Sequence, residues 1–283
     1  MLLENKISFI NEFYFKGSGL KHLQKNDFKN FKIPLPPLDI QKQSVAECES
    51  VESENSRILN EIAEQKEQIN RVLAKTGILN VEFQDNEDLK DLPTPQDYNL
   101  TEWESVKLKN VAFYPNNKIE VEFLTAKNYV GVDNLLQNKE GKRDADFVLQ
   151  SGMANEFIKD DILIGNIRPY LKKIWFADID GGTNGDVIVI RILNKENINS
   201  KFLYLILKDD SFFDYDMKHV KGLKMPRGNK EAILNYKFLL PPLEAQEKIV
   251  QAINSIEQKI SSLQTELNSL NGKQKEILEK YLF

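Results

Sequence analysis

The chain has 283 residues, 41% of them hydrophobic and 10% aromatic, with a formal net charge of −5. This length allows one large domain or two ordinary ones, and the composition excludes a chain that is disordered throughout. The acidic balance by itself argues against a nucleic-acid binder, but acidic helices can offset a basic face elsewhere. The single cysteine, Cys48, excludes an internal disulfide framework, and no run of about 18 apolar residues is present to span a membrane, so we expect a cytoplasmic protein.

The first 33 residues read as the end of a domain. Phe9, Phe13, Tyr14 and Phe15 are too apolar for a solvated tail, which indicates that this segment packs against other parts of a protein. Its pattern corresponds to the closing part of the middle region described below. We therefore expect the C-terminal remnant of a domain whose body lies outside this sequence.

Residues 34–77 are predicted to form a proline junction followed by a long helix. Pro36 and Pro37 end an extended segment, no glycine or proline interrupts residues 39–75, and Gly77 is a suitable C-cap. At ~1.5 Å per residue this helix is roughly 55 Å long, so it needs a partner along one face. Its apolar residues recur at the spacing of a coiled-coil seam: Val45, Cys48, Val51, Ile58, Ile62 and Val72.

A linker and then a globular domain follow this helix. Residues 78–99 are acidic and carry Pro93 and Pro95, which is typical of a stiff linker. Residues 100–238 are predicted to be a mixed α/β domain with a strongly β core. We expect strands at 103–108, 129–132, 161–164, 174–177 and 186–190, a glycine loop with positive φ at 181–185, and an amphipathic helix at 199–208 capped by Ser200.

The chain contains the junction and the helix twice. Aligning Pro36 with Pro241 gives an offset of 241 − 36 = 205, and this offset places Gln41 on Gln246. A chance match drifts out of phase within a turn or two, which this one does not. Residues 239–283 are therefore predicted to be a second junction and helix, whose seam consists of Ile253, Ile256, Ile260, Leu263, Leu267, Leu270 and Ile277.

No catalytic constellation assembles from the sequence. Two histidines and one cysteine are too few for a zinc site, and the glycines at 181–185 lack the Lys-Ser/Thr pair of a P-loop. The pairs Asp160-Asp161 and Asp209-Asp210 are interpreted as structural, because acidic residues are common at strand and helix ends. We expect no metal and no catalytic residue on this chain.

The remaining polar signal is cationic and is confined to the globular domain. Arginine reads guanine edges, asparagine reads adenine, and lysine anchors phosphates. A charge run is often only a solvated face, but in an acidic chain a cluster in one domain favours nucleic-acid binding. The candidate DNA-binding residues are Lys127, Asn128, Lys142, Arg143, Asn166, Arg168, Tyr170, Lys172, Lys173, Lys218, Lys221, Lys224, Arg227, Asn229 and Lys230.

The layout resembles the DNA specificity subunit of type I restriction–modification systems. The resemblance rests on the doubled junction, which reads IPLPPL at 33–38 with Gln41 and FLLPPL at 238–243 with Gln246. The Trp103-Glu104 opening of the middle domain and its segment 161–174 also look like parts of a target-recognition domain. The resemblance covers nearly the whole chain.

The resemblance implies a non-enzymatic reader of double-stranded DNA. In this family two target-recognition domains each read half of a bipartite site, and two antiparallel helices hold them apart. The helices also dock methyltransferase (modification) subunits, which bind S-adenosylmethionine, and a restriction/translocase subunit joins the complex. No cofactor is therefore expected on this chain. The sequence departs from the family pattern because it holds one complete recognition domain, so it looks N-terminally truncated, with the other half supplied by a separate chain or by a copy of itself.

The expected fold class is α+β, with one mixed α/β, β-rich target-recognition domain and two long helices that form an antiparallel coiled coil. The antiparallel direction also follows from the chain path, because the linker and the domain must return the chain to the far end of the first helix. A coiled-coil assembly module without DNA readout is the alternative function, and a hydrolase that uses the acidic pairs is a third. Substitution of Lys224 and Arg227 by alanine would separate the first two, since only a DNA reader would lose affinity.

Overall fold

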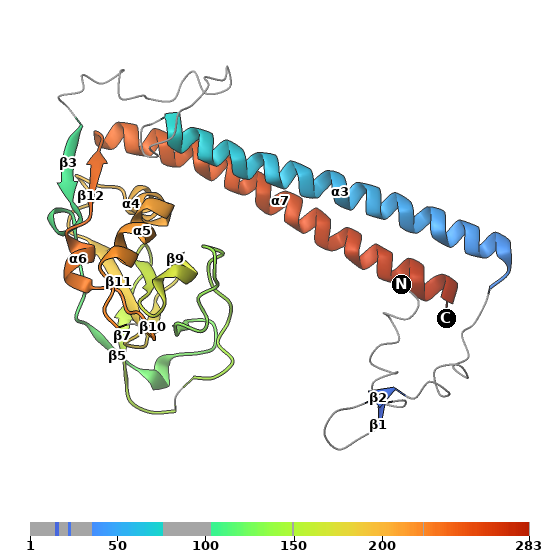
Figure 1. Cartoon of the computed structure of the whole chain (residues 1–283), viewed down its shortest axis with the longest axis horizontal. Helices are drawn as coiled ribbons and strands as arrows, with labels where there is room; N and C mark the ends of the chain where they lie inside the picture. The colour runs from blue at the N-terminus through green and yellow to red at the C-terminus, as the bar shows by residue number, and fades with distance from the viewer. Residues whose placement is uncertain are drawn as a thin grey trace. The chain divides into compact units, whose positions relative to one another are not determined.

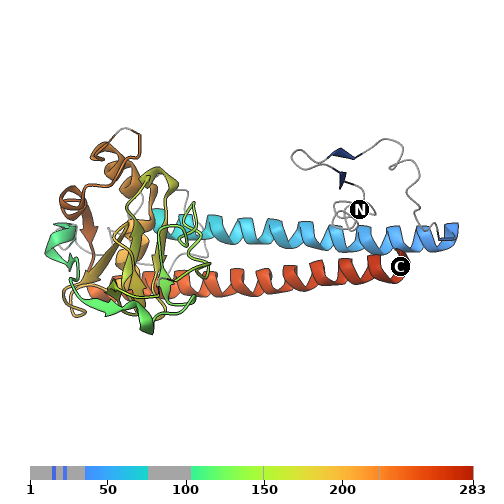
Figure 2. The ribbon, with the colours of Figure 1, turned by 90° about the horizontal axis from the view of Figure 1, so that it is seen from below.

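The computed structural model (Figures 1 and 2) describes residues 15–16, 22–23, 36–75, 103–148, 150–222 and 224–282. The chain divides into two compact units, Met1–Glu67 with Ile256–Phe283, and Gln68–Ser255. Of the predicted remnant at 1–33, only two short strands are described, β1 (Phe15–Lys16) and β2 (His22–Leu23), which pair antiparallel. The predicted linker at 78–99 lies outside the described residues.

Two long helices begin directly after the two proline pairs. They are α3 (Leu38–Lys75) and α7 (Leu243–Leu282). Both first turns are built alike, since the backbone N–H of Gln41 donates to the carbonyl of Pro37 (2.9 Å) and that of Gln246 donates to the carbonyl of Pro242 (3.1 Å). The two helices predicted from the duplicated sequence are confirmed. No helix in the described part of the chain is both long and apolar enough to cross a membrane.

The first unit contains the larger part of both helices, which lie side by side in both views (Figures 1 and 2). Gln274 Nε2 donates to Glu52 Oε1 (3.4 Å) near one end of the pair. Lys259 Nζ lies 3.9 Å from Glu61 Oε1 further along. Residue numbers therefore rise in one helix as they fall in the other, and the predicted antiparallel coiled coil is confirmed.

The seam between the helices is apolar. Ile58, Ile62 and Leu263 are buried together, and Ile260, Leu267 and Leu270 pack against them. Burying branched aliphatic side chains along one stripe stabilises a pair of helices that are each too long to stand alone. The other seam candidates are buried or half-buried in the chain: Cys48, Val51, Val72, Ile253, Ile256 and Ile277.

Val45 is the seam candidate that the structure corrects. Its side chain is 53% exposed, whereas Ser44 and Cys48 are buried on the same helix. A seam that passes through Cys48 in steps of three and four reaches Ser44 and then Gln41. Val45 therefore lies one position off the seam, and its exposed side chain does not pack between the two helices.

The second unit, Gln68–Ser255, contains the β-rich domain. A two-stranded antiparallel sheet pairs β3 (Glu104–Lys107) with β12 (Lys237–Leu240), so the start and the end of the domain meet. One four-stranded sheet has the order β5 (Lys118–Glu120), β7 (Met153–Phe157), β10 (Gly181–Thr183), β6 (Tyr129–Val130), and the other has the order β4 (Ala112–Phe113), β11 (Val187–Ile192), β8 (Ile162–Gly165), β9 (Ile174–Phe176). The helices are α4 (Ser200–Lys208), α5 (Asp210–Lys218) and α6 (Lys230–Leu234), with short 3₁₀ turns η3 (Leu108–Asn110), η4 (Val121–Phe123) and η5 (Pro169–Leu171).

The domain core lies between its sheets. Phe157 on β7 and Trp175 on β9 meet edge to face, with ring centroids 5.8 Å apart. Leu163 and Val189, from the paired strands β8 and β11, belong to the same buried cluster. Continuous apolar runs at these strands place side chains inside on both faces. The expected α+β class with a β-rich domain is confirmed.

The glycine segment at 181–185 differs from the predicted loop. Residues 181–183 form strand β10 at the centre of a sheet, and none of the three glycines has a positive φ. A Cβ at Gly181 would lie 2.0 Å from the carbonyl oxygen of Asn128, and one at Gly182 would lie 2.6 Å from Leu124 Cδ1. These glycines permit close packing of neighbouring segments rather than an unusual backbone conformation.

The cap of helix α4 also differs from the prediction. The side chain of Asn199, rather than that of Ser200, accepts hydrogen bonds from the backbone N–H groups of Lys201 (2.9 Å) and Phe202 (3.1 Å). Asparagine is among the strongest N-caps, because its short side chain reaches the unpaired N–H groups of the first turn. The helix predicted at 199–208 is present, and its residues 202–207 are all buried in the domain.

Candidate nucleic-acid interface

Two cationic segments that are distant in sequence are joined by backbone hydrogen bonds. The first follows β8 and runs from Asn166 to Lys173. The second runs from Lys218, the last residue of α5, to Lys230, the first residue of α6. The backbone N–H of Arg168 donates to the carbonyl of Pro226 (2.8 Å), and that of Gly228 donates to the carbonyl of Asn166 (3.0 Å). The structure therefore brings these two segments together on one surface, which we call the loop surface: residues 166–173 and 218–230.

The second segment is closed into a tight turn. Lys221 and Arg227 exchange two backbone hydrogen bonds of 2.9 Å each. Gly222 has a φ of 86°, which glycine adopts without a steric cost. This closure presents the side chains of Lys221, Lys224 and Arg227 to solvent, where all three are exposed.

Arg227 is held by an acidic neighbour that the sequence does not single out. Its Nη1 lies 3.0 Å from Asp186 Oδ1, and both side chains are partly exposed. Asp186 is fixed by its backbone, since its carbonyl accepts from the N–H of Asn166 (2.8 Å) and its N–H donates to Asn184 Oδ1 (3.1 Å). A guanidinium that faces a carboxylate is restricted in the directions it can take.

A buried polar cluster lies beneath the turn. Asp216 on α5 and Asn166 are both buried, and neither Asp216 Oδ1 nor Asn166 Oδ1 has a hydrogen-bond partner among the described residues. Burial raises the pKa of Asp216 to about 6, and the N–H of Asn229 and the charge of His219 partly offset this rise. A Cβ at Gly228 would lie 2.9 to 3.0 Å from these oxygens, so the backbone passes directly against them.

The first segment is shaped by two residues with left-handed backbone. Arg168 (φ 54°) precedes the 3₁₀ turn η5 and Lys172 (φ 49°) follows it. Tyr170, inside this turn, is 48% exposed, so its ring is accessible for stacking. The side chain of Arg168 is exposed and makes no ion pair within the described part of the chain.

Lys172 shares an acidic partner with Lys139, which is not among the predicted DNA-binding residues. Asp210, at the start of α5, pairs with Lys172 Nζ (2.7 Å) and with Lys139 Nζ (2.8 Å). These two lysines hold the pKa of Asp210 below its usual range. Lys139 is 33 residues from Lys172 in sequence (172 − 139 = 33), and backbone hydrogen bonds from Asn138 to Leu171 and from Lys139 to Lys172 join their loops.

Several other candidates are engaged in local structure. Lys142 Nζ donates to the carbonyl of Lys127 (2.7 Å), Asn128 Oδ1 accepts from the Thr125 N–H (2.6 Å), and Arg143 pairs with Asp146 (2.7 Å). These contacts stabilise the loops after η4 and β6. The side chains of Asn128, Lys142 and Arg143 therefore take part in local loop structure, and Lys127 contributes its backbone carbonyl to it.

Of the remaining candidates, Lys173, Asn229 and Lys230 also have contacts within the domain. Lys173 Nζ donates to the carbonyl of Val132 (2.7 Å), and burial lowers its pKa. Asn229 accepts from the N–H of Glu231 (3.2 Å) and caps α6. Lys230 Nζ lies 6.0 Å from the ring centroid of Tyr114, a cation–π distance, while Lys218 is exposed. Among the predicted candidates on the loop surface, the exposed residues are Arg168, Tyr170, Lys218, Lys221, Lys224, Arg227 and Lys230, whereas Lys172 is half-buried and paired with Asp210.

The acidic pairs considered for catalysis have structural roles. Asp161 is buried and accepts two hydrogen bonds of 2.8 Å from Arg191. Asp209 caps α5 by accepting from the Ser211 N–H (2.9 Å). Among the described residues, no three His, Cys, Asp or Glu side chains are grouped as metal ligands.

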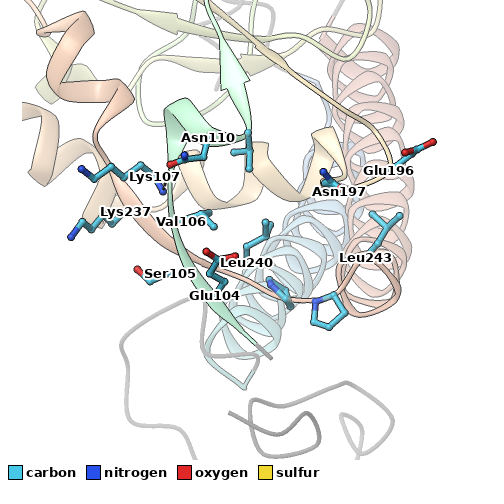
Figure 3. A pocket seen from close by; sticks show the side chains of 13 residues that line it. Glu104, Ser105, Val106, Lys107, Asn110, Glu196, Asn197, Lys237, Leu240 and Leu243 are labelled. Atoms are coloured by element: carbon cyan, nitrogen blue, oxygen red, sulfur yellow. Dashed lines mark hydrogen bonds between the residues drawn. The ribbon is translucent and has the colours of Figure 1, made fainter. Parts of the chain in front are cut away.

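A cavity of about 690 Å³ lies where β3 and β12 reach the second proline junction. Lys107 and Lys237 lie side by side on the paired strands, with Glu196 at the opposite side (Figure 3). Charges of both signs line it, and the lining includes no histidine or cysteine. Nothing in this lining forms a nucleophile–base pair, so the cavity does not favour the hydrolase alternative.

A glutamine at the same junction connects α7 to the domain. Gln246 is fully buried, and its Nε2 donates to the carbonyls of Pro241 (2.8 Å) and Asn197 (3.1 Å). Its Oε1 accepts from the backbone N–H of Asn199 (2.8 Å). At the first junction Gln41 Nε2 donates to the carbonyl of Pro36 (2.7 Å). The two copies of the sequence therefore share the glutamine–proline bond.

Comparison with known proteins places these features in a family. The chain is 28% identical over 286 residues to the type I restriction enzyme MjaVIII specificity subunit of Methanocaldococcus jannaschii, covering 94% of this chain and 65% of that protein. It is 22% identical to the EcoDI specificity subunit of Escherichia coli, covering 90% of this chain and 61% of that protein. The chain thus spans less than two thirds of the length of these relatives.

Solved structures share the fold. The S subunit of the type I restriction–modification system from M. genitalium superposes with a TM-score of 0.54 at 15% identity, over 100% of this chain and 71% of that one. A chain from a structure of the assembly and conformational transition of a type I system gives a TM-score of 0.53 at 17% identity, over 99% and 68%. The model of the type I restriction modification DNA specificity domain matches residues 1–68 and 101–272. Since that match covers more than half of the sequence, the chain belongs to the type I restriction–modification DNA specificity family.

Proposed function

We propose that this chain is a non-catalytic specificity subunit that binds double-stranded DNA in a sequence-specific manner through the loop surface. The observation that carries the proposal is the backbone link between Arg168 and Pro226, which unites two cationic segments on one surface in a member of a DNA specificity family. Lysine and arginine side chains there can neutralise phosphates, and Tyr170 and Arg227 are suited to contacts with bases.

A salt titration tests this proposal. The affinity of the full chain for a duplex should fall linearly in log–log form with rising salt, because each neutralised phosphate releases counterions. Replacing both Arg168 and Lys224 by alanine should reduce the slope by about 1 to 2. Replacing Lys259 and Lys273 on α7 removes the same charge from the coiled coil and serves as the matched control. An affinity that does not depend on salt, or equal effects of the two double variants, would contradict the proposal.

The antiparallel coiled coil supports a second part of the proposal. We propose that the exposed faces of α3 and α7 dock methyltransferase subunits, which bring S-adenosylmethionine, and that a restriction/translocase subunit joins the complex. The helices carry exposed charged residues beside their seam, for example Arg57 on α3, which pairs with Glu54 on the same helix and with Glu266 on α7. Co-purification with the methyltransferase subunit, and a methylation-site map of cells with and without this chain, would test the assembly.

The first junction supports the proposal that the chain reads part of a bipartite site. On α7, Leu243 and Val250 are half-buried and buried, whereas the equivalent residues on α3, Leu38 and Val45, are 64% and 53% exposed. The side chain of Gln246 binds Asn197 and Asn199 as well as Pro241, whereas the only side-chain hydrogen bond of Gln41 among the described residues goes to Pro36. We propose that a second recognition domain packs on the start of α3 as the described one packs on α7. Its source is a separate half-subunit or a second copy of this chain.

A further inference from the structure

We infer that Arg227 reads a guanine base and that Asp186 is the positioning residue that directs it. This inference rests on the proposed DNA-binding function and adds the base and the residue that recognises it. It separates the cations of the loop surface into one base reader and several phosphate anchors.

The ion pair distinguishes Arg227 from the lysines of the same turn. Lys221 and Lys224 are exposed and have no acidic partner within the described part of the chain. Arg227 Nη1 faces Asp186 Oδ1 at 3.0 Å, which occupies only part of the guanidinium. The other donors of the planar fork remain available, and a bidentate pair to O6 and N7 of guanine needs two of them.

The negative charge of Asp186 argues against a phosphate as the target of Arg227. A carboxylate within an ion pair of the arginine repels a phosphate brought to the same place, because like charges at a few ångström repel strongly in a partly desolvated interface. A guanine edge carries acceptor atoms but no full charge, so it does not meet this repulsion. Asp186 is 34% exposed and thus lies near the surface where this discrimination would act.

The backbone under Arg227 is fixed, as base recognition requires. Arg227 exchanges two backbone hydrogen bonds with Lys221, and its bridge to Ile167 joins the turn to the segment after β8. The next residue, Gly228, passes against the buried oxygens of Asn166 and Asp216 with no space for a side chain. A side chain that reads a base must be held within a fraction of an ångström, and this site has that support.

The test compares specific with non-specific binding. A preferred duplex is first selected from randomised DNA with the full chain, and affinities for it and for a mixed-sequence duplex are then measured over a range of salt. Arg227→Ala should weaken binding to the selected duplex by about 10-fold or more, and should leave mixed-sequence binding and the salt slope nearly unchanged. Lys224→Ala should weaken both duplexes alike and lower the slope by about 0.9.

Two further variants protect the result against a folding artefact. Arg227→Lys keeps the charge but loses the paired N–H donors of the planar guanidinium, so it should lose nearly as much specificity as Arg227→Ala does. Asp186→Asn should raise mixed-sequence affinity while the ratio of specific to non-specific binding falls, which a purely structural role of Asp186 does not predict. A repeated selection with Arg227→Lys should no longer require guanine at one position.

Three outcomes would overturn the inference. The first is that Arg227→Ala lowers the affinity for both duplexes equally and reduces the salt slope, which would identify Arg227 as a phosphate contact. The second is an unchanged guanine requirement after the repeated selection. The third is a wild-type preference without any guanine. Each of these leaves wild-type DNA binding intact, whereas a wild-type chain that binds no duplex contradicts the proposed function itself.

Discussion

Asp216 is a buried acidic side chain next to the loop surface. It lies beneath the turn, where Tyr114, His219 and the N–H of Asn229 face it. Burial favours the neutral acid and raises its pKa to about 6 from an ordinary value of 3.8. The folded state therefore holds the proton to a higher pH than the unfolded state does, and Asp216 costs stability once it is ionised.

The substitution Asp216→Asn should remove this pH dependence. Between about pH 4 and pH 6 the folded wild type binds more protons than the unfolded chain, so its stability falls as the pH rises through this window. The amide cannot ionise, so the free energy of unfolding of the variant should rise relative to that of the wild type by about 1 to 3 kcal/mol as the pH goes from about 4 to 6. Above about pH 6 this difference should stay constant. Urea unfolding at a series of pH values measures the difference. Asp214→Asn, exposed on the same helix, controls for the loss of one charge, and a difference that does not vary with pH would contradict this assignment.

At the scale of elements, the coiled coil depends on a narrow stripe of residues. Ile58 is fully buried in the seam, whereas Leu59, the next residue on α3, is 53% exposed. The helix turns by about 100° per residue, so two adjacent aliphatic residues have opposite environments. Hydrophobicity alone does not separate them, but the heptad phase does.

This contrast gives a matched pair of substitutions. Ile58→Ala removes a buried side chain and leaves a cavity between the helices, so it should destabilise the chain by about 2 to 5 kcal/mol. Leu59→Ala removes a similar volume from the surface and should change stability by about 0.5 kcal/mol or less. Thermal and urea unfolding, followed by the helical circular dichroism signal, compare the two. Similar losses in both variants would place the seam elsewhere.

For the whole molecule, the duplication gives two glutamines with the same local bond but different surroundings. Gln41 and Gln246 both donate to a proline carbonyl five residues before them. Only Gln246 also binds Asn197 and Asn199 of the described domain. The second junction thus unites a helix with a domain, while the first holds its glutamine without such partners among the described residues.

Substitution of each glutamine by alanine should reveal this difference. Gln246→Ala leaves a buried N–H and two carbonyls without a partner and should cost about 2 to 4 kcal/mol. Gln41→Ala loses one part-buried bond and should cost about 1 kcal/mol or less. Urea unfolding of the full chain measures both costs. If a second recognition domain packs on α3, adding the half-subunit that carries it should increase the cost at Gln41, and equal costs in the isolated chain would contradict the asymmetry.

The sequence by itself determined the parts of this protein that follow from periodicity and repetition. The offset between Pro36 and Pro241 predicted two helices with one seam, because heptad spacing is a local property that survives without knowledge of the fold. Strands such as β8 and β11 were also predicted, since each is a short apolar run between turn residues. The cations of the loop surface were found by residue type alone.

Only the tertiary structure decided how those cations are used. It paired Arg227 with Asp186 and Lys172 with Asp210, and it gave Asn229 to a helix cap. It also made Gly181–Thr183 a central strand, because the space beside Asn128 admits no side chain. These outcomes depend on contacts between segments far apart in the chain. Residue type shows what a side chain can do, and the packing of its neighbours decides which of those possibilities remains.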